Sequence, residues 1–124
     1  IRKFSEAKCG DELVFWGTGK TLRQHLYVDD LAEIITTLLE KHTTDSPLII
    51  SHNENLSIRE HIEVCKKATS KNIRIRFNGS LDGQYRKDAS NDKLIKLIGK
   101  YDFTPLKDGL KKTYDWYQKN RSTK

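Results

Sequence analysis

The chain has 124 residues, enough for one hydrophobic core and too few for two independent ones. Hydrophobic residues are 35% and charged residues 32% of the chain, against globular averages of about 45–50% and about 25%, so we expect a small or shared core. The 23 Lys and Arg against 17 Asp and Glu give a net charge of +6; because both signs are interspersed, a simple basic tail is excluded, while nucleic acid or a small phosphorylated ligand stays open as a partner.

The first part of the chain predicts a helix end followed by two short strands. Residues up to Ala7 have a helical composition that stops at Gly10, a residue suited to the left-handed conformation at helix ends. Two short apolar runs, Leu13 to Trp16 and His25 to Val28, predict strands joined by a polar loop.

An amphipathic helix is the clearest predicted element. Asp29 and Asp30 suit the positive end of a helix. The apolar residues that follow them repeat at intervals of three and four, at Leu31, Ile34, Ile35, Leu38 and Leu39. After Pro47, the apolar run Leu48 to Ile50 predicts a short strand covered on both faces.

The second half continues the alternation of helices and strands. Ser57 and Glu60 form a capping box at the start of a helix, and Ile73 to Phe77 alternates apolar and polar residues like a strand with one buried face. Ser90 is predicted to cap a short helix that ends at Gly99, and a final helix follows Pro105. The sequence therefore predicts an α/β fold with short strands and about four helices, frayed after residue 120.

Several familiar sites are not supported by the sequence. Gly17 to Thr21 looks like the end of a phosphate-binding loop, but the first glycine of that motif would fall on Val14. The four histidines share no metal-ligand spacing, and no Ser/His/Asp or Cys/His set stands out, so no metal and no catalytic residue is predicted. Cys9 and Cys65 lie far apart, which favours a reducing, cytoplasmic setting. No apolar stretch approaches the roughly 20 residues of a membrane span.

Cationic side chains on two predicted loops are the more informative feature. Arg23 lies on one loop, and Arg86 and Lys87 lie on another beside Asp82. A guanidinium and an ammonium that converge suit a diphosphate, and Trp16 could pack against a base or a sugar. The alternative is that these cations are ordinary solvated charges and that Trp16 belongs to the core.

Two segments carry a resemblance to a known family. Trp16 to Gly19, with Arg23 to Ala32, resembles a motif of the extended short-chain dehydrogenase/reductases. Asp82 to Lys87 resembles more specifically their GDP-L-fucose synthase branch, NADP-dependent enzymes that epimerise and reduce GDP-4-keto-6-deoxy-D-mannose. The likeness extends from Phe4 to Asn120.

The resemblance implies that residues 1–124 are the C-terminal substrate-binding domain of such an enzyme, an α/β unit whose N-terminal Rossmann domain would hold NADP and the catalytic groups. It places Trp16 beside the nucleotide sugar, Arg23 on the diphosphate, Asp82 on a polar group of the substrate, and Lys87 and Lys3 as further cations at the site. The whole enzyme is expected to be a cytoplasmic homodimer with no nucleic-acid or membrane partner, and this chain alone is expected to be inactive.

Two alternatives stay open at this point. One is another nucleotide-sugar epimerase or dehydratase of the same superfamily, which a panel of GDP-, UDP- and dTDP-sugars would separate. The other is a basic module that binds RNA or DNA with an affinity that falls steeply with salt.

Overall fold

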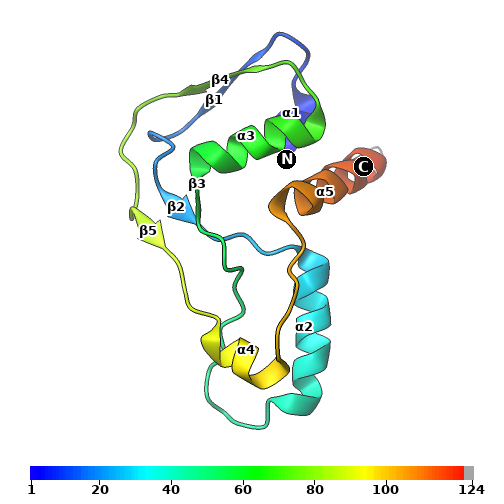
Figure 1. Cartoon of the computed structure of the whole chain (residues 1–124). Coiled ribbons are helices and arrows are strands. Elements are labelled where there is room, and N and C mark those ends of the chain that lie inside the picture. The colour runs from blue at the N-terminus through cyan, green and yellow to red at the C-terminus, as the bar shows by residue number, and fades with distance from the viewer. Residues whose placement is uncertain (122–124) are drawn as a thin grey trace.

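Helices and short strands alternate along residues 1–121, the part of the chain described by the structure, which is a computed structural model. The expected fraying after residue 120 falls largely on residues 122–124, outside the described residues. The five helices are α1 (Arg2–Glu6), α2 (Val28–Lys41), α3 (Ile58–Thr69), α4 (Asp92–Ile98) and α5 (Leu106–Asn120). Figure 1 shows α1, α3 and α5 gathered near both ends of the described chain, with α2 and α4 extending away from them. The α/β prediction is confirmed, with one more helix than expected.

The first sheet has two parallel strands. β1 (Glu12–Phe15) pairs with β4 (Arg74–Phe77), with Leu13 opposite Ile75. Along β4 the arginines are exposed and the apolar residues half-buried, so the predicted alternation is confirmed. This sheet packs on the main core cluster of Phe4, Ala7, Ile62, Cys65 and Ile73.

The second sheet has three strands of two residues each. β2 (Leu22–Arg23) lies in the middle, antiparallel to β3 (Leu56–Ser57) and parallel to β5 (Arg86–Lys87). The strand predicted at His25 to Val28 is therefore wrong: the strand lies earlier, and α2 already begins at Val28. The acidic residues in the first turn of α2 favour helix at this point.

The strand predicted at Leu48 to Ile50 is also wrong. This segment pairs with no strand among residues 1–121, and the Ile49 side chain is exposed. The apolar run matched a strand covered on both faces, but a run of apolar residues becomes a strand only where a neighbouring strand supplies hydrogen-bond partners.

The helices follow their sequence signals closely, with two exceptions. The predicted Ser90 cap of α4 is wrong, because the N-cap is Asn91, which makes no side-chain cap bond, although the Ser90 hydroxyl accepts from the Asp92 amide at 3.1 Å. The Ser57 and Glu60 capping box at the start of α3 is confirmed. In α2, Ile34 is fully buried, but Ile35 is 46% and Leu39 is 80% exposed, so the buried stripe is narrower than the periodicity indicated. No helix in the described part of the chain is long and apolar enough to cross a membrane.

Side chains from α2 and from the segment before it tie this helix to the rest of the fold. The buried carboxylate of Asp30 accepts hydrogen bonds from the amide and the hydroxyl of Thr104, at 2.8 and 2.7 Å. The Tyr27 ring packs so closely on Gly109 of α5 that a Cβ there would lie 3.1 Å from the ring. The connection from β2 to α2 is thus held against α5.

A single lysine closes the end of α1. The Lys71 ammonium donates to the carbonyl oxygens of Phe4, Ser5 and Ala7 at 2.6, 2.9 and 2.7 Å. The last carbonyls of a helix have no partner within the helix, and a cation there also complements the helix dipole. Lys71 follows Ser70, the C-cap of α3, so this cluster joins α1 to α3.

We predict that Lys71→Met lowers the free energy of unfolding by about 1.5–3 kcal/mol, the scale of hydrogen bonds to a charged group, because the side-chain stem is kept while three carbonyls lose their donor. Urea unfolding at pH 7 measures the loss. The control is Lys67→Met, since Lys67 is exposed on the same stretch of chain; equal losses in the two variants would contradict this role for Lys71.

Two histidines link the β2 to α2 connection with α3. The Nδ1 of His61 lies 2.8 Å from the Ser57 carbonyl, to which it can only donate. The Nε2 of His61 is then an acceptor, and the Nδ1 of His25, 2.6 Å away, donates to it. Burial, helped by the charges of His61 and Arg23, lowers the pKa of His25 from 6.5.

A lowered histidine pKa means that the folded state binds fewer protons than the unfolded state. The stability contributed by neutral His25 is thus complete above pH 6.5 and declines as the pH falls from 6.5 through the folded-state pKa. We predict that His25→Phe shows a smaller loss of stability between pH 7.5 and 5.5 in urea unfolding. His42→Gln, which alters a ring bonded only to its own loop, should behave like the unaltered chain. An equal loss in all three proteins would contradict the prediction.

Candidate functional site

The small second sheet brings two of the predicted site residues together. Arg23 of β2 and Lys87 of β5 are directly opposite each other in the parallel pairing. Residues opposite each other in a sheet project to the same face. The two cation-bearing segments, 64 positions apart in the sequence, therefore meet on one face of the sheet.

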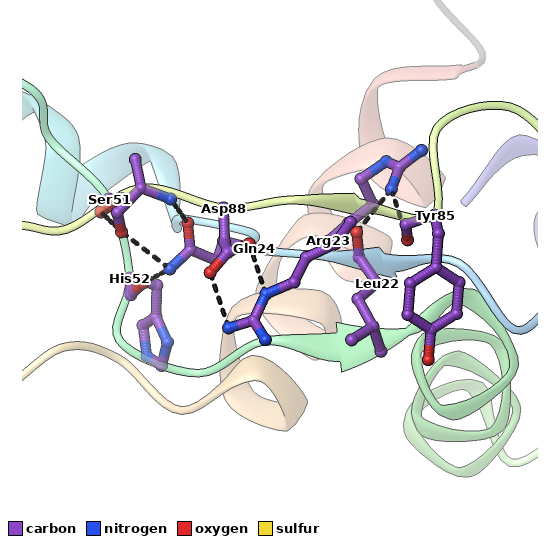
Figure 2. A network of polar contacts seen from close by, with 9 residues as sticks. Leu22, Arg23, Gln24, Ser51, His52, Tyr85 and Asp88 are labelled. Atoms are coloured by element: carbon purple, nitrogen blue, oxygen red, sulfur yellow. Dashed lines mark hydrogen bonds and ion pairs between the residues drawn. The ribbon is translucent and has the colours of Figure 1, made fainter.

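The Arg23 side chain also holds the segment that leads into β5. Its guanidinium donates to the carbonyl of Gln84 at 2.9 Å and lies 3.5 Å from that of Tyr85. Figure 2 shows it beside Leu22 and Tyr85, next to the strand pair. These acceptors are neutral, so the guanidinium keeps its full charge while its position is fixed.

The two neighbouring cations of β5 differ in their electrostatic surroundings. Arg86 makes a two-pronged ion pair with Asp88, at 2.6 and 2.8 Å. This contact raises the pKa of Arg86 and lowers that of Asp88. Lys87 makes no ion pair or side-chain hydrogen bond with residues 1–121 and is exposed. The cationic character of this face is thus carried by Arg23 and Lys87.

A cavity of about 550 Å³ opens beside this strand pair. Its volume lies within the range of about 300–1,000 Å³ that is common for small-molecule sites. Its lining is mostly polar, with Gln24, Ser51, His52, Gln84, Arg86, Lys87 and Asp88, and includes the apolar Leu26, Ile49, Ile50 and Ala89. Arg23 is not among the residues that line it. A ligand in this cavity would lie within reach of the Lys87 ammonium.

Asp82 holds the turn that follows β1. One of its carboxylate oxygens accepts from the Thr18 amide at 2.8 Å and the other from the Thr18 hydroxyl. These bonds lower the pKa of Asp82. Gly17 has a positive φ of 79°, and a Cβ on it would lie 2.2 Å from the Asp82 carboxylate. The turn therefore requires glycine at this position for two separate reasons.

Trp16 precedes this turn, and its side chain is 85% exposed. The alternative that Trp16 belongs to the core is therefore wrong. No hydrogen bond or aromatic contact within residues 1–121 joins the indole to Arg23 or Lys87. The turn that follows Trp16 leads along the chain into β2 and is bonded to Asp82.

Lys3 lies elsewhere. Its ammonium donates to the Val14 carbonyl at 2.7 Å and sits 4.9 Å from the centre of the Phe15 ring. It lines a second, largely apolar cavity of about 660 Å³ between α1, α3 and α5. Leu26 is the one lining residue that this cavity shares with the polar cavity beside β5.

The glycine turn does not fit a dinucleotide. The Gly17 amide already donates to the side chains of Asn78 and Ser80, at 3.0 and 2.9 Å, and the Thr18 amide is bonded to Asp82. The turn leads into β2 rather than into a helix, whereas a phosphate-binding loop presents free amides at a helix N-terminus. This turn thus provides no place for the pyrophosphate of NADP, and we derive no step through it.

Sequence reasoning missed one residue that organises this region. The Gln24 side chain bonds to the backbone of both His52 and Ala89. Nothing in the sequence distinguishes this glutamine from a surface residue; its place beside Arg23 was the only signal. No group of three or more His, Cys, Asp or Glu that could hold a metal occurs among residues 1–121.

Comparisons with known proteins show what the chain is similar to. Residues 1–51 match the NAD dependent epimerase/dehydratase family. GDP-L-fucose synthase 1 of Arabidopsis thaliana is 38% identical over 132 aligned positions, which cover 97% of this chain and 38% of the relative.

Solved structures show the same fold. A GDP-L-fucose synthetase from Naegleria fowleri bound to NADP superposes with a TM-score of 0.85 at 30% identity, over 90% of this chain and 36% of that protein. UDP-glucuronic acid 4-epimerase from Bacillus cereus gives 0.74 at 25% identity, over 87% and 35%. The chain spans between a third and two fifths of the length of each of these proteins. By sequence and by fold, the chain is similar to the NAD dependent epimerase/dehydratase family and to part of the GDP-L-fucose synthases.

Proposed function

We propose that this chain binds the GDP-sugar of an NADP-dependent enzyme that epimerises and reduces GDP-4-keto-6-deoxy-D-mannose to GDP-L-fucose. The observation that carries the proposal is the pairing of Arg23 with Lys87, of which Lys87 lines the polar cavity. A planar guanidinium and a mobile ammonium together match the oxygens of a diphosphate. The relatives named above supply the identity of the nucleotide and the sugar.

In this proposal the diphosphate is an anchor rather than a reacting group. Binding energy gained at a remote part of the substrate positions the keto-sugar for reaction. The residues that move protons, and the binding site for NADP that delivers hydride, would belong to a Rossmann domain N-terminal to these residues. We accordingly assign no catalytic residue to this chain and expect it to be inactive alone.

Asp82 and Trp16 would contribute from the neighbouring turn. Each Asp82 oxygen that accepts from Thr18 keeps a further lone pair, which we propose accepts a substrate hydroxyl. The exposed Trp16 indole offers a face on which a sugar or base can pack. Lys3 would contact a part of the substrate that extends into the second cavity.

We extend the proposal to the setting of the whole enzyme, a homodimer in the cytoplasm. Both cysteines carry free thiols, one exposed and one buried, which fits a reducing compartment. The competing candidate is a UDP-sugar or dTDP-sugar enzyme of the same family, favoured by the fold shared with UDP-glucuronic acid 4-epimerase.

We predict that Lys87→Ala weakens GDP binding by about tenfold or more, because a charge-assisted hydrogen bond is lost. Isothermal titration of the full protein that carries this chain measures the dissociation constants for GDP, UDP and dTDP. Arg23→Lys should also weaken GDP binding, since an ammonium cannot both bond the Gln84 carbonyl and offer a planar fork.

The matched control is Lys67→Ala, which removes an exposed lysine from α3. Unchanged GDP affinity in Lys87→Ala would remove Lys87 from the site. Tighter binding of UDP or dTDP than of GDP would decide for the competing candidate, and strong salt-dependent binding to RNA or DNA of any sequence would favour the nucleic-acid hypothesis.

A further inference from the structure

The ladder between β2 and β5 is too short to fix the cations by itself. It consists of two residue pairs, Leu22 with Arg86 and Arg23 with Lys87. Short strand pairs gain little from their own backbone hydrogen bonds and depend on neighbouring contacts. Something beyond the ladder must therefore set the separation between the Arg23 and Lys87 side chains.

The Gln24 side chain continues the ladder where the backbone stops. Its Oε1 accepts from the Ala89 amide at 2.8 Å, and its Nε2 donates to the Ala89 carbonyl at 3.2 Å. One primary amide thus satisfies both backbone groups of one residue, as a paired strand residue would. The same Nε2 donates to the His52 carbonyl at 2.8 Å, so three chain segments meet at Gln24, as Figure 2 shows.

Arg23 and Gln24 together fasten β5 at both of its ends. The Arg23 guanidinium bonds the backbone just before β5, at Gln84 and Tyr85. Gln24 bonds the backbone just after it, at Ala89. Lys87 lies between these two attachments, and the first of them is made by the other cation of the pair.

We propose that Gln24 is a positioning residue, which sets the spacing between Arg23 and Lys87 and thereby the affinity of this site for a diphosphate. The inference rests on the proposed function and adds a residue that acts through Arg23 and Lys87, while its own side chain also lines the polar cavity. Only an amide of this length fits, because the position needs an acceptor for one N–H and donors for two carbonyls. A carboxylate would face the His52 and Ala89 carbonyl oxygens with no proton to donate. Leucine would leave the Ala89 amide and the His52 carbonyl without these bonds, and the Ala89 carbonyl would keep only the Ser51 hydroxyl as a donor.

The test compares GDP with GMP, which lacks the diphosphate, by isothermal titration of the full protein. Gln24→Leu is expected to weaken GDP binding by about tenfold and GMP binding clearly less, so that the GDP to GMP affinity ratio falls. General destabilisation would lower both affinities together. The control Gln118→Leu removes a glutamine with two side-chain bonds in α5 and should leave the ratio unchanged.

A second variant keeps the test decisive if Gln24→Leu does not fold. Gln24→Glu is expected to bind GDP poorly at pH 7.5 and to recover toward the unaltered protein near pH 5, because a protonated carboxyl regains one donor. The unaltered protein, titrated over the same range, accounts for the protonation of GDP, of His52 and of the Arg86 and Asp88 pair.

The outcomes separate the two proposals. An unchanged GDP to GMP ratio in Gln24→Leu, or no recovery of Gln24→Glu at low pH, while Lys87→Ala still weakens GDP binding, overturns the role of Gln24 alone. Absence of GDP binding by the unaltered protein, or full affinity in Lys87→Ala, overturns the proposed function and this inference with it.

Discussion

The candidate site depends on a parallel contact between two strands of two residues each. β2 and β5 come from distant parts of the chain, and their pairing places Arg23 opposite Lys87. Two like charges on one face repel each other, so this arrangement costs free energy until an anion occupies it. The neutral acceptors around Arg23 and the amide bonds of Gln24 hold the cations without neutralising them. The third cation, Arg86, is neutralised by its ion pair with Asp88.

The helices could be predicted from the sequence because their signals are local. The capping box at Ser57 and the acidic first turn of α2 act within a few residues, and both operate as expected. The apolar alternation of β4 is equally local and equally reliable. The strand expected at His25 to Val28 failed because short strands are defined by partners far away in the sequence, which a pattern within one segment cannot reveal.

The candidate site, like the fold, could be predicted from the sequence only in part. The chemistry of the Arg23 and Lys87 side chains predicted that their two segments converge, and the structure brings these two residues together. The prediction that they lie on loops is wrong, because they pair as strands β2 and β5. Other features of the site could be recognised only from the structure. The exposed Trp16 and the two Thr18 bonds of Asp82 follow from the shape of one turn. The hydrogen bonds of the Gln24 side chain span 28 and 65 positions of the sequence. No residue type or spacing in the sequence indicates them.

The extended segment from Leu48 to Ile50 affects how readily this chain aggregates. Its amides and carbonyls lack strand partners among residues 1–121, and the Ile49 side chain is exposed beside them. An open apolar edge of this kind is a template on which another chain can add a strand, which is how many proteins begin to aggregate. Charged side chains on an edge usually prevent such pairing. The acidic residues nearest to this segment, Asp45 and Glu54, lie outside it at either end. Concentrated samples are therefore expected to aggregate through this edge before the helical core unfolds.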